Sequence, residues 1–159
     1  ADAVTVDLLS RAAKPSGLST TGDVIEVDKA RQVMFIVLGG QTRWIINVST
    51  GSDIPYVEKS GKTGEIVTGD AHTPAGRFRV YFERPDGWRE SDLGKLWRPK
   101  YFNGGIAVHG SASIPGYPAS HGCVRVSVAA MDWIWATDLM PRNRAVWVYE
   151  SVESVTNPA

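Results

Sequence analysis

From residue 23 onward, short apolar or alternating runs are separated by turn residues, which is the pattern of consecutive β-strands. The first three runs cover residues 24–28, 33–38 and 43–48. Gly39 and Gly40 separate the second run from the third. A glycine pair at this place predicts a hairpin, because glycine accepts the positive φ angles of a tight turn.

The middle of the chain mixes polar stretches with strand-like runs. Residues 49–73 are rich in Gly, Ser, Thr and Asp, so we expect a long loop with one short strand near residues 66–67. Loops of this length in a compact domain are often functional. Residues 77–83 alternate cleanly and predict one strand. Residues 88–102 are irregular and aromatic; most of these rings are expected in the core and a minority in a groove.

The last part of the chain predicts a helix followed by a strand. Ser127 is a good N-cap, because a serine hydroxyl accepts a hydrogen bond from a free amide of the first helical turn. Apolar residues then recur at helical spacing up to about Leu139. Pro141 and Asn143 end the helix. Residues 144–150 alternate again and predict a final strand.

These elements predict a mainly β fold, β-sandwich-like, with about eight to ten short strands and one helix packed on the sheet. Residues 23–150 would form this domain, and residues 151–159 a polar C-terminal tail. Residues 1–22 would be an N-terminal arm or linker. Within them, residues 4–13 suit a short helix, and residues 16–22 have the composition of a flexible linker. An ordered arm and the end of a removed module both fit this pattern.

Length and charge restrict the class of protein. With 159 residues, of which 43% are hydrophobic, the chain has the size of one domain that buries its own core. Its 17 basic and 17 acidic residues cancel, which argues against binding to nucleic acid or anionic membranes. No apolar run approaches the roughly 18 residues of a membrane span. The N-terminus lacks a signal region, as expected of a cytosolic protein or a trimmed mature form.

Residues 106–126 contain the side chains with the most chemistry, which are His109, His121 and the single cysteine, Cys123. A lone cysteine is usually a small buried hydrophobe. Here Gly122 lets the backbone turn sharply and leave the sulfur accessible. A thiol with an ordinary pKa of about 8.5 needs an imidazole partner to become a nucleophile at neutral pH. The stretch therefore predicts a cysteine nucleophile with a histidine base.

The position of His109 favours it as the base. It comes from a different strand than Cys123, as base and nucleophile do in cysteine proteases, whereas His121 lies only two residues before the cysteine. A third group must orient the ring, and no acid lies nearby in the sequence. Successive amides of His121, Gly122 and Cys123 could point together at a carbonyl oxygen and stabilise an oxyanion.

A zinc enzyme is the rival chemical hypothesis. Four residues could supply a zinc sphere: His72, His109, His121 and Cys123. Their spacing matches no zinc motif, and Cys-x-x-Cys and His-Glu-x-x-His are both absent. A serine hydrolase is weaker still, because Gly-x-Ser-x-Gly is absent. His72, alone at the end of a loop, is more simply a surface or packing residue.

The same stretch resembles the signature of the L,D-transpeptidase catalytic domain, also called the YkuD family. His109-Gly110 is followed by a short loop and by Ser120-His121-Gly122-Cys123-Val124-Arg125. Ser49-Thr50-Gly51 and residues 73–78 (TPAGRF) resemble two upstream motifs of the family. Similarity extends to the opening hairpin at residues 24–40 and to the approach to the histidine, and so covers about residues 23–150.

The resemblance implies an enzyme of peptidoglycan synthesis outside the cytoplasmic membrane, in the periplasm or cell wall. Cys123 would attack the third residue of a tetrapeptide stem, release D-alanine and form a thioester. An amine of a neighbouring stem would then complete a 3→3 cross-link. Water as acceptor would give a carboxypeptidase, and some relatives attach proteins to the wall. The implied partners are peptidoglycan stems and carbapenem β-lactams; no cofactor, no nucleic acid and a monomer are expected.

By position, the resemblance also implies the roles of individual residues. His109 would be the base, and the carbonyl of Gly110 would orient its ring. The oxyanion hole would consist of the amides of His121, Gly122 and Cys123. Substrate contacts are expected from Ser120, Arg125, Tyr101, Phe102 and Tyr117.

Two departures from the family pattern matter. The loop between Gly110 and His121 is shorter than in many relatives, so the lid would be reduced or supplied by residues 49–73. Arg125 stands where many relatives have asparagine, and either contacts a substrate carboxylate or braces the loop.

A function of another class is also considered. In this hypothesis the chain is a non-catalytic wall-binding module, whose six tryptophans hold glycan and whose cysteine is inert.

Overall fold

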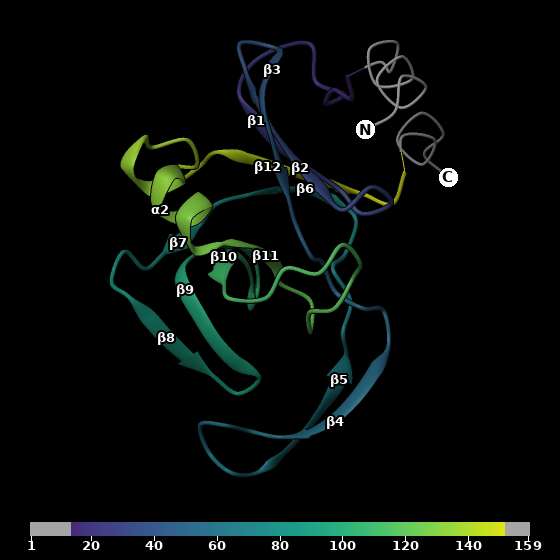
Figure 1. Ribbon diagram of the computed structural model, residues 1–159, viewed down its shortest axis with the longest axis vertical. Coiled ribbons are helices and arrows are strands. Elements are labelled where there is room, and N and C mark those ends of the chain that lie inside the picture. The colour runs from purple at the N-terminus through teal and green to yellow at the C-terminus, as the bar shows by residue number, and fades with distance from the viewer. Residues whose placement is uncertain (1–13, 152–159) are drawn as a thin grey trace, which may run out of the picture.

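Two β-sheets enclose the core of the molecule, and one helix covers part of the second sheet (Figure 1). The computed structural model describes residues 14–151. The first sheet runs in the order β3 (Gln41–Asn47), β2 (Val33–Leu38), β1 (Val24–Asp28), β12 (Ala145–Tyr149) and β6 (Gly76–Arg79). The second contains β11 (Val124–Ser127), β10 (Ile106–Ser111), β9 (Gly94–Asn103) and β7 (Phe82–Glu83), with β8 (Trp88–Ser91) also paired to β9. β4 (Pro55–Lys59) and β5 (Ile66–Asp70) form a separate hairpin, and the helix is α2 (Val128–Ala136).

Several predicted elements are confirmed. β1 and β2 have the predicted bounds, and Gly39 and Gly40 turn the chain from β2 to β3 with φ of 58° and 72°. Ser127 is the N-cap of α2, since its hydroxyl accepts a hydrogen bond from the Ala130 amide at 3.0 Å. The helix ends at Ala136, before the predicted end. Strands dominate the described residues, as expected of the mainly β fold.

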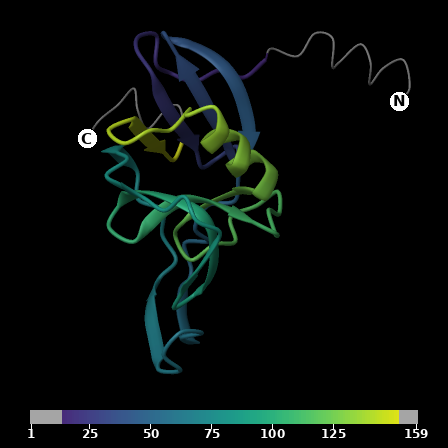
Figure 2. The ribbon, with the colours of Figure 1, turned by 90° about the vertical axis from the view of Figure 1, so that its left-hand side faces the viewer.

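Three predictions for the middle of the chain are wrong. The short strand predicted near residues 66–67 is present as part of β5, but residues 49–73 are not otherwise a long loop, because they contain the β4–β5 hairpin, which Figure 2 shows projecting away from the two sheets. Most side chains of this hairpin face solvent, so its sequence carries no buried face to detect. Residues 77–83 are two strands instead of one, because β6 pairs with β12 while β7 pairs with β9. Residues 88–102 form the β8–β9 hairpin.

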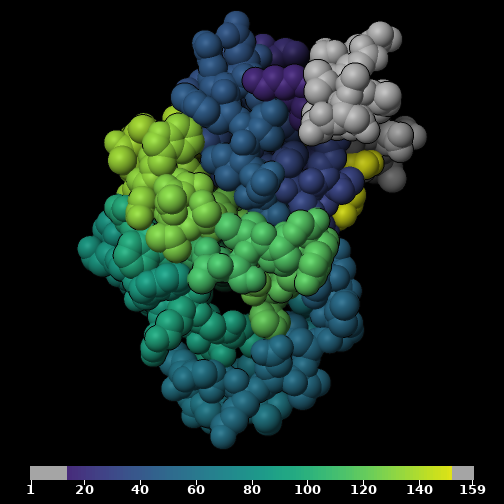
Figure 3. All heavy atoms as spheres, in the orientation of Figure 1, coloured from purple at the N-terminus to yellow at the C-terminus, as the bar shows by residue number. Residues whose placement is uncertain are grey.

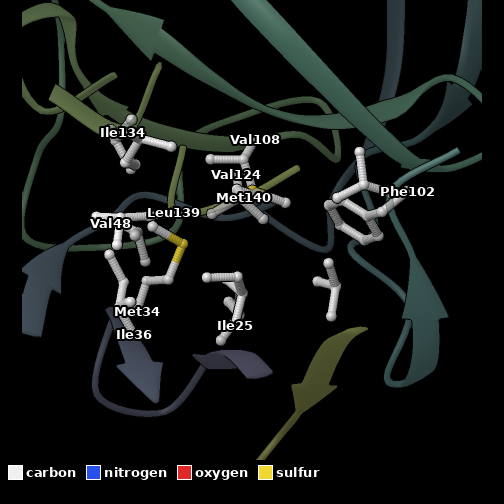
Figure 4. Close-up of a cluster of buried hydrophobic side chains, with 14 of the residues drawn as sticks. Ile25, Met34, Ile36, Val48, Phe102, Val108, Val124, Ile134, Leu139 and Met140 are labelled. Atoms are coloured by element: carbon white, nitrogen blue, oxygen red, sulfur yellow. The ribbon is translucent and has the colours of Figure 1, made fainter. Parts of the chain in front are cut away.

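The main core lies between the two sheets (Figure 4). Ile25 and Met34 from the first sheet meet Val108 and Val124 from the second, and each is at most 1% exposed. Met131 and Ile134 are the buried residues of α2. The helix therefore shields the core beside β10 and β11, the strands that carry the signature residues.

Part of the N-terminal arm packs on the first sheet. The buried carboxylate of Glu26 accepts hydrogen bonds from the amides of Leu18 (2.6 Å) and Ser19 (2.8 Å). The flexible-linker interpretation is therefore wrong for these residues. The predicted helix at residues 4–13 and most of the C-terminal tail lie outside the described residues. Within residues 14–151, no helix has the length and apolar character needed to cross a membrane.

Replacing Ile134 with alanine is expected to lower the free energy of unfolding by about 2–5 kcal/mol, because it leaves a cavity between α2 and the sheet. Ile66→Ala is the matched control, since Ile66 is 66% exposed and Ile134 only 1%. The control should change stability by no more than about 0.5 kcal/mol. Urea denaturation followed by tryptophan fluorescence measures both. Equal losses would contradict the placement of α2 against the core.

Candidate active site

The parallel pairing of β10 and β11 places the signature side chains on one wall of a cleft. Val108 pairs with Val124 and His109 with Arg125. Because successive side chains of a strand face opposite sides, the two valines enter the core while His109 and Arg125 face outward. Both line a cleft of about 850 Å³ together with Cys123. In Figure 3 this side of the molecule is visibly hollowed.

His109 is held in one orientation and in one tautomer. The ring is 5% exposed, and its Nδ1 lies 2.9 Å from the carbonyl oxygen of Gly110. A carbonyl only accepts, so Nδ1 carries the hydrogen and Nε2 keeps a free lone pair. The contact implied by the family resemblance is therefore present. Sequence spacing alone had left the orienting group open.

Burial makes the uncharged form of His109 the stable one. It lowers the pKa of the imidazole to about 4, and the positive charge of Arg125 acts in the same direction, while the bond to Gly110 opposes the shift. At neutral pH the ring is therefore a neutral proton acceptor.

Cys123 is half-buried, with its Sγ 3.7 Å from the carbonyl oxygen of Gly105. Burial raises the pKa of this thiol, against the opposing effects of the Ala107 amide and of Arg125. Burial thus favours the neutral form of both groups. A nucleophilic attack from this site would require the thiol proton to leave as the new bond forms, with no preformed ion pair.

Gly122 allows the sharp turn before the cysteine. Its φ of 127° is rarely adopted by other residues, and a Cβ here would lie 2.8 Å from the carbonyl oxygen of His72. The Gly122 amide donates to the Ser120 hydroxyl at 3.1 Å. That amide is already occupied, so its predicted place in the oxyanion hole is not supported. The amides of His121 and Cys123 remain the candidate donors.

Residues of the two upstream motifs, Ser49-Thr50-Gly51 and TPAGRF, form hydrogen bonds to this turn. The buried hydroxyl of Thr73 donates to the carbonyl of Gly122 at 2.7 Å and accepts from the amide of Gly51 at 2.8 Å. The carbonyl of Thr50 accepts from the amide of Ser120 at 2.9 Å. Sequence reasoning missed Thr73 as part of the site. The only signal was its place in the TPAGRF segment, which the resemblance singled out without a role.

Three of the predicted substrate residues line the cleft: Tyr101, Ser120 and Arg125. Phe102 does not. It is 4% exposed and packs near Phe78 in the core, because neighbours on a strand face opposite sides. Its prediction as a substrate contact is therefore wrong. Tyr117 is 65% exposed and lies outside the cleft lining, so its role stays a prediction.

The other two histidines pair with carboxylates. The His121 Nε2 lies 2.8 Å from Glu58 Oε1, and the His72 Nδ1 lies 2.5 Å from Asp53 Oδ1. His72 is thus a surface residue, as predicted. Among residues 14–151, no three His, Cys, Asp or Glu side chains gather in a way that could hold a metal ion. The zinc-binding cluster of the rival hypothesis therefore does not form in this geometry.

Two hairpins bound the cleft opposite the signature strands. Tyr56 of β4 lines one side, and residues 91–96 of the β8–β9 hairpin line another. The expectation that residues 49–73 contribute a cover is consistent with the first. The second was missed, because residues 88–102 had been interpreted as irregular.

A buried histidine with a fixed tautomer and a half-buried cysteine on a tight glycine turn thus line one cleft of a two-sheet fold. A model of the YkuD family, the L,D-transpeptidase catalytic domain, matches residues 22–154. The chain belongs to this family.

Solved structures of relatives agree in fold. An L,D-transpeptidase from Xylanimonas cellulosilytica is 46% identical, with a TM-score of 0.81 over 93% of this chain and 70% of that one. The C442S mutant of the Enterococcus faecium L,D-transpeptidase is 20% identical, with a TM-score of 0.55 over 80% and 50%. The L,D-transpeptidase LdtMt1 in complex with imipenem is 16% identical, with a TM-score of 0.58 over 80% and 59%. No match was found among curated proteins.

Thr73→Val is expected to destabilise the protein by about 1–3 kcal/mol, because it leaves the buried carbonyl of Gly122 and the buried amide of Gly51 without a partner. Thr73→Ser keeps the hydroxyl and should retain most of the stability. Thermal and urea unfolding of both variants measure the difference. A valine variant as stable as the wild type would show that this hydroxyl does not hold the turn.

Proposed function

We propose that this chain is a peptidoglycan L,D-transpeptidase that forms 3→3 cross-links through a thioacyl intermediate on Cys123. The observation that carries this proposal is the fixed tautomer of His109. The bond from Nδ1 leaves Nε2 as the unprotonated nitrogen, and His109 lines the same cleft as Cys123. Membership of the family supplies the substrate class. Because peptidoglycan stems lie outside the cytoplasmic membrane, we also propose an extracytoplasmic location.

In the first half-reaction, the sulfur of Cys123 attacks the carbonyl carbon of the third stem residue while Nε2 of His109 takes the thiol proton. The amides of His121 and Cys123 stabilise the resulting oxyanion. When the tetrahedral intermediate collapses, His109 returns the proton to the nitrogen of the departing D-alanine. A thioester remains on the enzyme.

In the second half-reaction, an uncharged amine of a neighbouring stem attacks the thioester carbonyl, and His109 accepts the amine proton. Collapse of this intermediate breaks the carbon–sulfur bond. The proton returns to the sulfur, so the free thiol is restored and the new peptide bond is the cross-link. Water in place of the amine would release a tripeptide stem.

Arg125 is proposed to bind a substrate carboxylate. Its backbone amide and carbonyl each bond to Ser49, at 2.9 and 3.0 Å. The main chain therefore braces the loop, and the guanidinium is left at the cleft wall. A cation next to the thiol suits the terminal carboxylate of the stem that donates the acyl group.

Incubation with a disaccharide-tetrapeptide, followed by mass spectrometry of the products, tests the function. We expect a 3→3 linked dimer and free D-alanine from the wild type, and neither from Cys123→Ala. A tripeptide alone would assign water as the acceptor. Unchanged substrate with folded wild-type protein would overturn the proposal.

A carbapenem is expected to acylate Cys123, as a strained acyl donor that needs only the first half-reaction. Intact-mass spectrometry should show one adduct on the wild type and none on Cys123→Ala. An adduct of equal yield on the alanine variant would remove Cys123 as the nucleophile.

The rate of this acylation should stay level from about pH 8 down to about pH 5 and fall as His109 protonates near pH 4. The sign follows from burial, which lowers the pKa of the imidazole and so extends the range of the free base toward acid. His109→Gln should slow acylation by about 10²–10⁴-fold. Stopped-flow measurements across pH test both. An inflection near pH 6.5 would contradict this prediction, because it would mean that the titrating histidine is exposed to solvent and not buried as His109 is.

A further inference from the structure

A row of side chains leads from Cys123 across the second sheet. The parallel register of β10 and β11 brings Cys123, which directly precedes β11, beside Ala107. Ala107 is paired with Tyr101 of β9, and Tyr101 is paired in turn with Phe82 of β7. Residues directly opposite each other on neighbouring strands share one face of the sheet. The face that borders the cleft therefore carries the cysteine, a small residue and two aromatic rings in one line.

The aromatic side chains continue beyond the cleft. Tyr101 lines the cleft, whereas Phe82 and Tyr81 lie outside its lining. The ring centroid of Phe82 is 5.7 Å from that of Tyr101 and 6.5 Å from that of Tyr81, and the planes differ by only 34° and 28°. Phe82 is 36% exposed and Tyr81 47%. We call these three rings the aromatic strip, which begins in the cleft and ends on the open surface.

The outer end of the strip is held in place by polar contacts. The hydroxyl of Tyr81 donates to the carbonyl of Gly104, in the turn between β9 and β10. The amide of Tyr81 donates to the carbonyl of Tyr101 at 3.0 Å. Side chains that are ordered before a ligand arrives lose little conformational entropy on binding. The strip is thus a preformed surface at the margin of the cleft.

Two guanidinium groups border the strip. The guanidinium carbon of Arg84 lies 4.7 Å from the centroid of the Phe82 ring, and Nη2 of Arg142 donates to the carbonyl oxygen of Tyr81 at 2.9 Å. A guanidinium has five N–H donors, so most of those of Arg142 stay available after this bond. Apolar ring faces and hydrogen-bond donors therefore stand side by side.

The distance from the cysteine to the strip matches the length of a peptide stem. Adjacent strands lie about 4.8 Å apart, so Phe82, three strand spacings from Cys123, is roughly 14 Å away. In the proposed reaction the sulfur meets the carbonyl of the third stem residue. Three extended residues span roughly 10 Å, and the far end of the stem is joined to glycan. A stem that follows the row of side chains brings its sugar to the outer part of the strip.

The proposed position of the other end of the stem agrees with this direction. Arg125, which is proposed to bind the terminal carboxylate, belongs to β11, and β11 lies at the opposite end of the strand order from β7. The carboxylate and the glycan would therefore lie on opposite sides of Cys123, as the two ends of one extended stem should.

We propose that the aromatic strip is a glycan subsite, which holds the sugar rings that carry the donor stem. The C–H groups on one face of a sugar ring pack against the electron-rich face of an aromatic ring. Hydroxyl and acetamido oxygens of the sugar accept hydrogen bonds from the guanidinium groups. The inference rests on the proposed function, because the stem attached at Cys123 brings the glycan to the strip.

The test compares two substrates that differ only in the sugar, the disaccharide-tetrapeptide and the same tetrapeptide with an acetylated N-terminus. D-alanine release gives kcat/KM for each, and their ratio measures the contribution of the glycan. Phe82→Leu removes the ring but keeps an apolar side chain beside Tyr101, whereas Phe82→Tyr keeps the ring. Trp44→Leu is the matched control, since Trp44 is 41% exposed but belongs to β3 of the first sheet.

In the wild type, the disaccharide is expected to raise kcat/KM by roughly tenfold. Phe82→Leu should lower this ratio by roughly threefold to tenfold, the loss expected for one ring contact. Phe82→Tyr and Trp44→Leu should keep the wild-type ratio. A general disturbance of the cleft changes kcat/KM for both substrates and cancels in the ratio, as does the fraction of active protein.

Peptide-free glycan strands give a second readout that needs no turnover. They should bind to Cys123→Ala, and roughly threefold to tenfold more weakly once Phe82→Leu is added to that variant. Isothermal titration calorimetry measures both affinities. Equal affinities, or no binding to Cys123→Ala, would remove the strip as a glycan subsite.

Equal kcat/KM for the two substrates in the wild type would also overturn the proposal, and so would a ratio that Phe82→Leu leaves unchanged. Failure of the proposed function gives a different result, because the wild type would then release D-alanine from neither substrate. The binding of glycan strands would still decide whether the strip holds sugar.

Discussion

The parallel register between β10 and β11 is the constraint on which the site depends. It sets Val108 against Val124 in the core and so turns His109, Arg125 and the preceding cysteine toward the cleft. A slip of one residue would exchange the two faces and turn His109 and Arg125 toward the core. The short return to β11 requires a tight turn, which Gly122 permits and the Thr73 hydroxyl holds.

Burial then decides the charge state of the site. It removes water from both the imidazole and the thiol and so favours the neutral form of each. A neutral imidazole with a fixed tautomer suits the proton-accepting role that we propose for His109.

The β4–β5 hairpin is held in place by different interactions from those of the two sheets. Ile54, Val57 and Ile66 are more than 60% exposed, so apolar burial contributes little to holding the β4–β5 hairpin in place. Polar contacts at and near its tip do so instead, from Glu58 to His121 and from Ser60 and Gly61 to Asp92. Segments held in this way open at lower free energy than a packed core. The cleft is thus bounded by packed strands on one side and by a hairpin held by few polar contacts on another.

Local pattern was enough to predict the β1–β2 strands, the Ser127 cap, and the histidine and cysteine of the site, because each depends on a periodicity, a cap or a motif that lies within a few residues. The family resemblance added the Gly110 contact. Only the tertiary structure divided residues 77–83 between two sheets and revealed the exposed β4–β5 hairpin, since a strand with no buried face leaves no hydrophobic period. The position of Phe102 in the core was likewise visible only in the tertiary structure.

The supporting contacts of the site were equally beyond local sequence. Thr73 and Gly122 are 49 residues apart, and Glu58 and His121 are 63 apart. Which residues meet across such distances depends on how the strands pair, and pairing is decided by the burial of the whole core. The sequence by itself therefore determined which groups are candidates for the chemistry, and the tertiary structure decided their orientation, the protonation form that burial favours and the cleft that they line.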